Sequence, residues 1–412
     1  MYNFGKLCNI WENIMKNIEK EKCMEYNVNI RQEVFGATIM NLRTGKREYV
    51  TNEELEKILN YKIFPSNSII NVINEEKNIK YTALKNRNIN HFSFADIAYI
   101  ELTRDCNLKC KHCLNNSGQV MPNQFNNNEL IKLINELADE GLQEIRFTGG
   151  EPLVYKDIYG LINLATTLGL YTSIGTNATL ITKDVAKKLK KAGLKKAIVS
   201  LDGTEEAHEL IRGKGTYTKT IEGINNLKSN NIDVRINSVV MKDNMEDIIN
   251  LAKKMHKNKT SLFIRRFIES GRGSFLKNNT LTKKDYDYLR NKLSYELENG
   301  NYINGHYLRN DEGIVHRINL PFKFTKGCKA GQRALVIMPD GELHLCGFLA
   351  AQGFESLGNV RNINDWNEYW NKIHQIDYLK ILRNNLENYN SLPNIQPTNC
   401  LAYVQRFLNC ED

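Results

Sequence analysis

The sequence predicts an α/β fold built around a parallel β-sheet. Short apolar runs alternate with helix-like stretches, and this alternation is typical of consecutive β-α units. In such sheets, ligands bind beyond the carboxyl ends of the strands, so the segments that follow each strand are candidate sites. The predicted strands cover residues 97–103, 144–148, 171–175, 196–201, 233–240 and 261–267, and the predicted helices cover residues 127–140, 157–168, 183–192, 218–230 and 243–256.

Length and composition restrict the class of protein. The chain has 412 residues, which allows two or three domains, and its hydrophobic fraction of 41% supports well-packed cores. It contains no apolar run long enough to span a bilayer and no signal-peptide pattern at its start, so we expect a cytoplasmic protein without a membrane partner. In a reducing compartment, its 9 cysteines indicate metal or redox chemistry in preference to disulfides.

The formal net charge of +9 raises the question of a nucleic-acid partner. The lysines are scattered through helix-like stretches such as residues 183–196, and no arginine-rich tract or aromatic ladder is present. We therefore expect no nucleic-acid partner. An acidic partner, such as a peptide with Asp and Glu, fits this charge.

Three cysteines directly after the first predicted strand form the most informative motif. Cys106, Cys110 and Cys113 have the spacing C-x₃-C-x₂-C. We expect this loop to bring three thiolates to one point, and soft thiolates select zinc or an iron–sulfur cluster. A zinc site is normally closed by a fourth protein ligand, and no further cysteine or histidine pair follows nearby. Three thiolates on a four-iron cluster leave one iron free for a small ligand.

A second motif follows the next predicted strand. Gly149 and Gly150 allow the backbone to approach a ligand closely, and Glu151 supplies a carboxylate for an ammonium group. The two motifs in this order resemble the radical S-adenosylmethionine (SAM) superfamily. The resemblance implies that the three cysteines hold a [4Fe-4S] cluster, that SAM binds its free iron, and that Gly149, Gly150 and Glu151 hold the SAM amino group. A zinc loop beside an ordinary Gly-Gly turn is the alternative, but it explains the two motifs separately.

Polar residues follow the other predicted strands. The resemblance implies a partial (β/α)6 TIM-type barrel, in which these groups contact SAM: Ser200 and Asp202 the ribose or its surroundings, and Arg212 the carboxylate, by a bidentate fork. Asn177 and Asp202 as simple helix caps are the alternative. The full set of candidate SAM contacts at these strand ends is Thr176, Asn177, Ser200, Asp202, Arg212 and Asn237.

The sixth predicted strand also ends in charged residues. Arg265, Arg266 and Glu269 lie at or just after its end. They line the mouth of a substrate site or form surface ion pairs, and the sequence leaves both open.

Residues 1–92 form a separate N-terminal region. Residues 35–50 predict a hairpin around a turn at 43–46, and Thr51 is a candidate N-cap for the helix that follows. This pattern resembles the winged-helix-like peptide-recognition domain of ribosomal-peptide maturases, which implies that a leader peptide adds a strand to the hairpin edge. A plain extension that packs on the core, residues 93–310, is the alternative.

Residues 311–412 resemble the auxiliary-cluster modules called SPASM and twitch. A Pro-Asp-Gly turn at 339–341 predicts a hairpin that ends near a cysteine. The resemblance implies one auxiliary [4Fe-4S] cluster, held by Cys328, Cys346, Cys400 and Cys410. A structural zinc site is one alternative, and a site without Cys410 is another. Cys8 and Cys23 have no motif around them, and we expect them to be buried as small apolar residues.

The whole chain resembles maturases of ribosomally made peptides. This implies a radical SAM oxidoreductase from an anaerobic host that cross-links a precursor peptide through a 5′-deoxyadenosyl radical, forming a thioether or a C–C bond. It also implies an electron donor such as ferredoxin or flavodoxin. Peptide epimerisation, sulfatase-maturase-like activity and small-molecule chemistry remain open. A non-enzymatic iron–sulfur sensor is disfavoured, because a sensor does not need the Gly-Gly-Glu loop.

Overall fold

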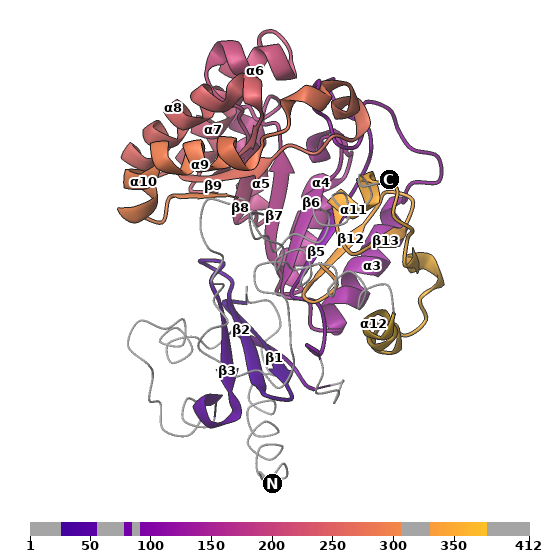
Figure 1. The fold of residues 1–412 in the computed structure, drawn as a ribbon. Helices are drawn as coiled ribbons and strands as arrows, with labels where there is room; N and C mark the ends of the chain where they lie inside the picture. Colours follow the sequence, from indigo (N-terminus) through magenta and orange to yellow (C-terminus); the bar gives the residue numbers. More distant parts are fainter. Residues whose placement is uncertain (1–25, 56–77, 85–90, 306–329, 377–412) are drawn as a thin grey trace.

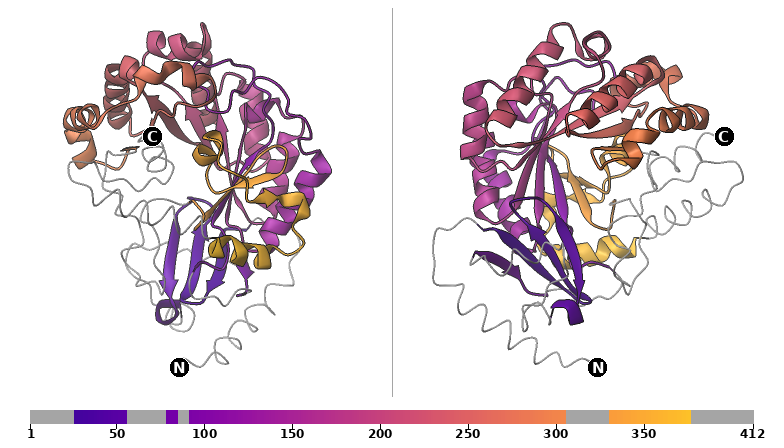
Figure 2. Two further views of the ribbon diagram at one scale, coloured as in Figure 1. Left: turned by 45° about the vertical axis from the view of Figure 1, so that its right-hand side comes forward. Right: turned by 90° about the vertical axis from the view of Figure 1, so that its left-hand side faces the viewer.

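The computed structural model describes residues 26–55, 78–84, 91–305 and 330–376. These residues form a small sheet of four strands and a large sheet of ten strands (Figure 1). Helices lie along the outer side of the curved large sheet, and the small sheet lies beyond one end of its strands (Figure 2). No helix in this described part of the chain has the length and apolar character needed to cross a membrane.

The small sheet contains the predicted hairpin and two strands that were not predicted. Its order is β3-β2-β1-β4, with β1, β2 and β3 antiparallel and β4 parallel to β1. At the hairpin turn, the Asn41 side chain accepts hydrogen bonds from the backbone N–H groups of Arg43 and Thr44. This confirms the hairpin, but the domain is a four-stranded sheet, with strands β1 Val28–Glu33, β2 Gly36–Asn41, β3 Arg47–Thr51 and β4 Ile79–Thr82.

The large sheet confirms the predicted parallel α/β core. Strands β5 to β11 are all parallel to their neighbours and follow one another in chain order across the sheet. The strands are β5 Ile97–Glu101, β6 Glu144–Thr148, β7 Tyr171–Thr176, β8 Lys196–Ser200, β9 Asp233–Val240, β10 Ser261–Arg266 and β11 Ile303–Gly305. The helices are α3 Asn127–Asp139, α4 Ile158–Thr167, α5 Lys183–Lys191, α6 Glu205–Arg212, α7 Thr216–Ser229, α8 Met245–Lys257, α9 Lys283–Lys292 and α10 Ser294–Glu298.

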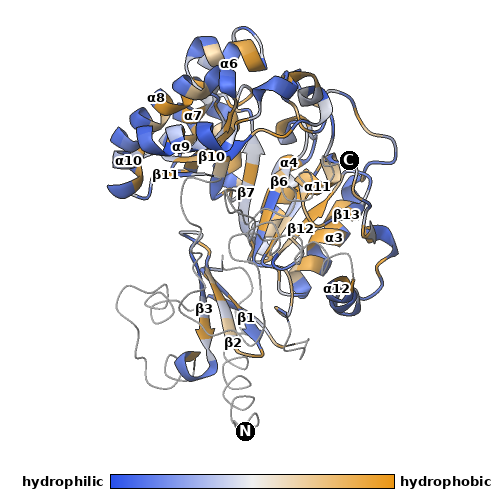
Figure 3. Cartoon of the chain, viewed as in Figure 1, coloured by the Kyte–Doolittle hydropathy of each residue, from blue (hydrophilic) through white to orange (hydrophobic). Residues whose placement is uncertain are grey.

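Helix α3 shows how the local sequence sets these elements. Asn126 and Glu129 form a reciprocal capping box that satisfies the backbone donors of the first turn. Leu130, Leu133 and Leu137 recur at helical spacing and are all buried in the core. Figure 3 shows this pattern along the chain: the helices carry both apolar and polar residues, and strand β12 is apolar throughout.

The C-terminal segment extends the large sheet. Strand β12 (Ala334–Ile337) pairs in parallel with β5, and β13 (Glu342–His344) pairs antiparallel with β12, which confirms the predicted hairpin. After β14 (Gly358–Asn359), helix α12 (Trp366–Gln375) packs on the core through Trp366 and Trp370.

A short helix from this segment reaches the opposite edge of the core. In α11 (Gly347–Ala351), the Phe348 ring lies 5.8 Å from the guanidinium carbon of Arg265 on β10. The hydroxyl of Ser270, just after β10, donates to the backbone carbonyl of Ala351. The segment that begins beside β5 therefore also contacts the region around β10, across the inner side of the curved sheet (Figure 2).

The small sheet packs against the amino ends of the core strands. The Arg31 guanidinium donates to the backbone carbonyls of Ala95, just before β5, and Gly141, just before β6, over 2.7 and 3.2 Å. The Asn29 amide donates over 2.9 Å to the carbonyl of Gly169, just before β7. The small sheet and the loops that follow the core strands therefore lie at opposite ends of those strands.

Candidate functional site

The cysteine loop follows β5, at the carboxyl end of the core strands. Cys106, Cys110 and Cys113 are free thiols, and Cys110 is buried. The backbone N–H of Leu108 lies 3.5 Å from the Cys106 sulfur, and that of Ser117 lies 3.4 Å from the Cys113 sulfur. Hydrogen bonds to the sulfurs are one way in which proteins adjust the potential of iron–sulfur clusters.

Two arginines place positive charge next to Cys110. The Arg212 guanidinium lies 3.8 Å from its sulfur, and Arg272 donates over 2.8 Å to its backbone carbonyl. Burial raises the pKa of the Cys106 thiol to about 11 and also raises the pKa of Cys110, although Arg212 opposes the shift at Cys110. A thiol must lose its proton to bind iron, and nearby cations favour the thiolate. The positive charge of the two arginines therefore favours the thiolate form that binds iron.

The three thiols lie near one another, because Cys110 and Cys113 both act on the charge of Cys106. Within the described residues, no group of three His, Cys, Asp or Glu side chains is close enough together to hold a single metal ion. A four-iron cluster does not require such convergence, because each thiolate binds a different iron. The donor set, three cysteines on one loop with backbone N–H groups and guanidinium groups beside them, fits such a cluster.

The Gly-Gly loop packs directly against the cysteine loop. A Cβ on Gly149 would lie 2.4 Å from the carbonyl oxygen of Thr103, and one on Gly150 would lie 2.0 Å from that of Asp105. The Gly150 N–H donates to the Thr103 carbonyl over 2.7 Å. The glycines therefore allow close contact with the backbone of the neighbouring loop, and their contact with SAM stays a prediction.

Glu151 joins the Gly-Gly loop to the end of β7. Its side chain is fully buried and accepts hydrogen bonds from the Thr176 hydroxyl at 2.7 Å, the Asn177 N–H at 2.8 Å and the Leu153 N–H at 3.3 Å. Burial outweighs these donors and raises its pKa to about 7. A carboxylate has about four acceptor positions, so one remains for an ammonium group.

Asn177 continues this chain of contacts back to the cysteine loop. Its side-chain amide donates over 2.9 Å to the side chain of Asn107, which lies between Cys106 and Cys110. The N-cap of α5 is Thr182, so Asn177 does not cap that helix. Asn107 was not singled out from the sequence, because an asparagine inside a loop gives no signal of its own.

Asp202 and Arg212 bind each other. The Arg212 Nε donates to Asp202 over 2.6 Å, and the Val239 N–H donates to the other carboxylate oxygen over 2.7 Å. Burial alone would raise the pKa of Asp202, but Arg212 and His112, whose Nε2 lies 3.1 Å away, hold it well below its usual range. Asp202 is not the cap of α6, which begins after Thr204. Direct contacts of this pair with SAM stay a prediction.

Ser200 and Asn237 lie side by side on the inner face. They are partners in the register of β8 and β9. The side-chain oxygen of Asn237 is buried and has no hydrogen-bond partner among the described residues. A buried acceptor of this kind is costly unless a ligand satisfies it, which agrees with a place at the edge of a binding site.

Among the expected auxiliary ligands, Cys346 is the one that lies inside the described residues. It is the N-cap of α11, and its sulfur accepts from the Phe348 N–H over 3.4 Å. The remaining expected ligands, Cys328, Cys400 and Cys410, lie outside the described residues, as do Cys8 and Cys23.

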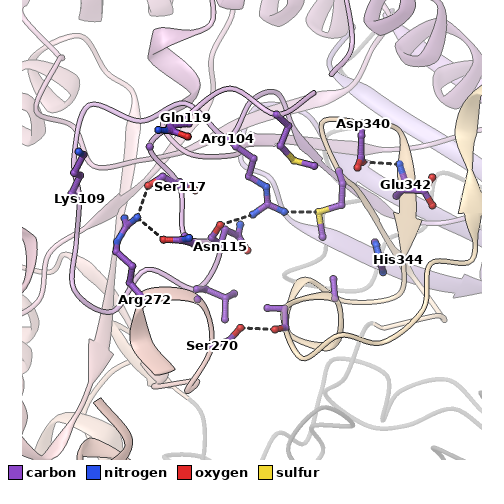
Figure 4. Close-up of a pocket in the computed structure, with 18 residues that line it drawn as sticks. Arg104, Lys109, Asn115, Ser117, Gln119, Ser270, Arg272, Asp340, Glu342 and His344 are labelled. Atoms are coloured by element: carbon purple, nitrogen blue, oxygen red, sulfur yellow. Dashed lines mark hydrogen bonds between the residues drawn. The ribbon is translucent and has the colours of Figure 1, made fainter. Parts of the chain in front are cut away.

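A cavity of about 800 Å³ lies beside the cysteine loop (Figure 4). Its wall joins residues 114–118 of that loop to the C-terminal hairpin, which contributes Asp340, Glu342 and His344. Arg272 holds the loop side by donating to the Ser117 carbonyl over 2.7 Å, and Arg104 reaches Met338 on the hairpin side. Sequence patterns did not indicate these arginines, because each acts on a segment that is distant along the chain.

The core is a parallel α/β sheet, and the cysteine loop and the Gly-Gly-Glu loop lie at the ends of adjacent strands. This combination is typical of iron–sulfur enzymes of the SAM-dependent radical class. The model of the Radical SAM superfamily matches residues 100–255. An AdoMet-dependent heme synthase of Nitratidesulfovibrio vulgaris is 31% identical over 292 residues, which cover 66% of this chain and 77% of that protein. The mycofactocin maturase MftC of Mycolicibacterium smegmatis is 28% identical over 277 residues, which cover 66% of this chain and 68% of that protein.

Solved structures share the fold. SuiB of Streptococcus suis, bound to its precursor peptide SuiA, aligns with a TM-score of 0.60 at 19% identity over 84% of this chain and 88% of that chain. The protein anSMEcpe with bound AdoMet and the Cp18Cys peptide aligns with a TM-score of 0.53 at 24% identity over 68% of this chain and 81% of that chain. The protein belongs to the radical SAM superfamily, and its cofactors are a [4Fe-4S] cluster and SAM.

Proposed function

We propose that this enzyme modifies a ribosomally made precursor peptide and forms a thioether or C–C cross-link in it. The observation that carries the proposal is the small N-terminal sheet, which packs on the core and whose strand β3 has no further strand beside it within the described residues. The structural similarity to SuiB, which was solved with its precursor peptide, extends over 84% of this chain. Residues 1–92 then recognise the peptide, residues 93–310 form the radical SAM core, and residues 311–412 form the auxiliary-cluster region.

Strand β3 offers the edge on which a leader peptide can bind. It is the last strand of the small sheet within the described residues. The N–H of Asn41 bonds to Lys46, and that of Asn52 bonds to Phe35. In an antiparallel ladder, bonded and non-bonded pairs alternate, so the backbone groups of Arg47 and Tyr49 point away from β2. An added strand gains its affinity from backbone groups of this kind.

The core residues would prepare the site for chemistry. With a cluster on Cys106, Cys110 and Cys113, the bound cofactors supply a 5′-deoxyadenosyl radical that removes hydrogen from an unreactive C–H bond. Arg212 offsets thiolate charge beside Cys110. Glu151 keeps one acceptor free for the SAM amino group and holds the Gly-Gly loop to β7. An external donor such as ferredoxin or flavodoxin would deliver the electron.

The C-terminal region would hold one auxiliary [4Fe-4S] cluster through Cys346, Cys328, Cys400 and Cys410. Cys346 supports this, because α11 places it close to Arg265 on the inner side of the core. Such a position suits a cluster that takes up the electron released when the product forms.

Chemistry on a small molecule is the second candidate. The sequence relatives include the heme synthase that is 31% identical to this chain. That match covers 66% of this chain, so a third of the chain lies outside it. A small-molecule enzyme would not bind a peptide on β3, and this difference separates the two candidates.

Co-expression with the product of a neighbouring short reading frame tests the proposal. We expect the peptide to lose two hydrogens for each cross-link, as measured by mass spectrometry. A peptide recovered without any mass change, but with an altered stereocentre, would show epimerisation. A peptide that is neither bound nor altered would leave small-molecule chemistry as the better explanation.

A further inference from the structure

Three arginines gather on the inner face of the core sheet. Arg146 on β6, Arg235 on β9 and Arg265 on β10 are close enough for their charges to act on one another. Tyr99 on β5 lies among them, with its ring centre 5.0 Å from the guanidinium carbon of Arg146. In the register of β9 and β10, Arg265 lies opposite Val239, four residues beyond Arg235, so the two side chains approach each other from different levels of the sheet. We call this group the arginine cluster.

The arginine cluster has more positive than negative charge. Arg146 is paired with Glu144 at 3.1 Å, and Glu144 is also shared with Arg47 of the small sheet at 3.6 Å. No ion pair is found for Arg235 or Arg265 within the described residues. Their guanidinium carbons lie 5.6 Å from the Phe263 ring and 5.8 Å from the Phe348 ring, which are weak compensation for a charge.

Both arginines also have unused hydrogen-bonding capacity in the described part of the chain. The Nε atoms of Arg235 and Arg265 are buried there without a hydrogen-bond partner. Burial, together with the charges of Arg146 and Arg265, lowers the pKa of Arg235 to about 10. Like charges that are half-buried and unpaired destabilise a fold, so their presence is explained best by a ligand that satisfies them.

The arginine cluster lies close to the end of the core that carries the cysteine and Gly-Gly loops. On β9, Arg235 and Asn237 share one face of the sheet, and Asn237 lies beside Ser200 at the carboxyl end of β8. Arg235 lies two residues before Asn237 along β9, which corresponds to about 7 Å. A group held by Arg235 therefore lies one layer of side chains away from the strand ends that carry the cysteine and Gly-Gly loops.

We propose that Arg235 and Arg265 bind a carboxylate of the substrate inside the core. The planar fork of a guanidinium matches the geometry of a carboxylate, which explains arginine in both positions. This inference rests on the proposed peptide substrate. The carboxylate then belongs to an Asp or Glu side chain or to the C-terminus of the peptide, and it fixes which residue lies beneath the cofactors.

Binding of the peptide to anaerobically reconstituted enzyme tests the site. Arg235→Met and Arg265→Met should each weaken binding by about tenfold or more, the loss expected for a charge-assisted hydrogen bond. Arg290→Gln, which removes an exposed arginine paired with Asp287, is the matched control and should bind normally. Peptides with Asp→Asn or Glu→Gln changes, or with an amidated C-terminus, then identify the carboxylate. Equal affinity for every neutralised peptide would overturn the proposal.

A second measurement does not depend on the peptide. Glutarate, a small dicarboxylate, should raise the unfolding temperature of the wild-type enzyme at constant ionic strength, whereas its neutral analogue glutaramide should not. The shift should be lost in Arg235→Met, which should itself unfold at the same or a higher temperature because a half-buried, unpaired charge is gone. A clear loss of stability in Arg235→Met would mean that the arginine cluster stabilises the fold and does not bind a ligand. An unchanged effect of glutarate on the unfolding temperature of this variant would mean the same. If the peptide does not bind at all, the proposed modification of a peptide is refuted. The glutarate measurement then still shows whether Arg235 and Arg265 bind a carboxylate.

Discussion

Arg31 of the small sheet donates a hydrogen bond to Asp96 of the core over 2.8 Å, and both side chains are almost completely buried. Asp96 also accepts from the Tyr49 hydroxyl over 2.6 Å and lies near Arg47 and Arg333. One carboxylate thus connects the N-terminal sheet, the core and the C-terminal segment. Burial would raise its pKa, but the three arginines and Tyr49 lower it to about 2.

Loss of this carboxylate should destabilise the whole protein. Asp96→Asn leaves three buried guanidinium groups without their shared charge, and we expect a loss of about 3–5 kcal/mol in the free energy of unfolding. Chemical denaturation at neutral pH measures this loss. Asp184→Asn, which breaks an exposed pair with Lys188, is the control and should leave the unfolding midpoint unchanged. Equal midpoints for the two variants would contradict the role given to Asp96.

The same residue predicts a dependence of stability on pH. The pKa of Asp96 is about 2 in the folded protein and about 3.9 in an unfolded chain. Its ionised form therefore stabilises the fold above about pH 4, and this contribution is lost as the pH falls toward 2. Unfolding measured between these pH values should show a smaller slope for Asp96→Asn than for the wild type. Identical slopes would show that other groups govern acid unfolding.

Replacement of the three cysteines of the first motif should remove one cluster. In a variant with Cys106, Cys110 and Cys113 all changed to Ala, we expect no SAM cleavage and about four fewer irons per chain after anaerobic reconstitution. Iron analysis and detection of 5′-deoxyadenosine measure the two effects. Iron that remains in this variant reports on the auxiliary site, and an unchanged iron content would refute the assignment of the cluster to this loop.

The Gly-Gly loop should tolerate no side chain at its second glycine. A Cβ in Gly150→Ala would lie 2.0 Å from the Asp105 carbonyl, so the two loops must separate. We expect weaker SAM binding and a lower unfolding temperature, as measured by calorimetry. In Gly175→Ala, the new Cβ would lie 3.6 Å from the Thr148 hydroxyl, an ordinary contact, so its stability should stay close to that of the wild type. A stable Gly150→Ala variant with normal SAM affinity would disprove the packing argument.

Leader binding should protect selected amides of β3. Addition of the precursor peptide should slow hydrogen exchange at Arg47 and Tyr49, whose backbone groups point to the open edge. Exchange at Glu48 and Val50, which face β2, should change much less, and these residues form the internal control. Protection confined to other parts of the protein would place the leader elsewhere.

Local sequence was sufficient for most of the core. Predicted strands such as 144–148 and 233–240 have the bounds that the structure shows, because apolar runs between polar, turn-forming residues are a local property. Strand β4 was missed. It is four residues long and pairs with β1 across a long stretch of chain, and no local pattern contains that pairing.

The site was predictable in its location but not in its internal bonds. Strand ends identified Glu151, Asp202 and Arg212 as neighbours of one site. Their contacts with SAM stay predictions. The structure adds that Asp202 and Arg212 bind each other and that Glu151 binds the end of β7. Hydrogen-bond partners depend on which loops pack together, and that follows from tertiary structure. Asp96 gave no sequence signal for the same reason, since its partner Arg333 lies in the C-terminal segment.

If the small sheet binds a leader peptide, its place at the amino ends of the core strands sets a minimum length for that peptide. The cysteine and Gly-Gly loops lie beyond the other ends, and β6 between them has five residues, a length of about 16 Å. An extended peptide needs at least about five residues to cover that distance. A precursor whose modifiable residue follows the recognised segment more closely than this would be held by the enzyme and yet never reach the radical.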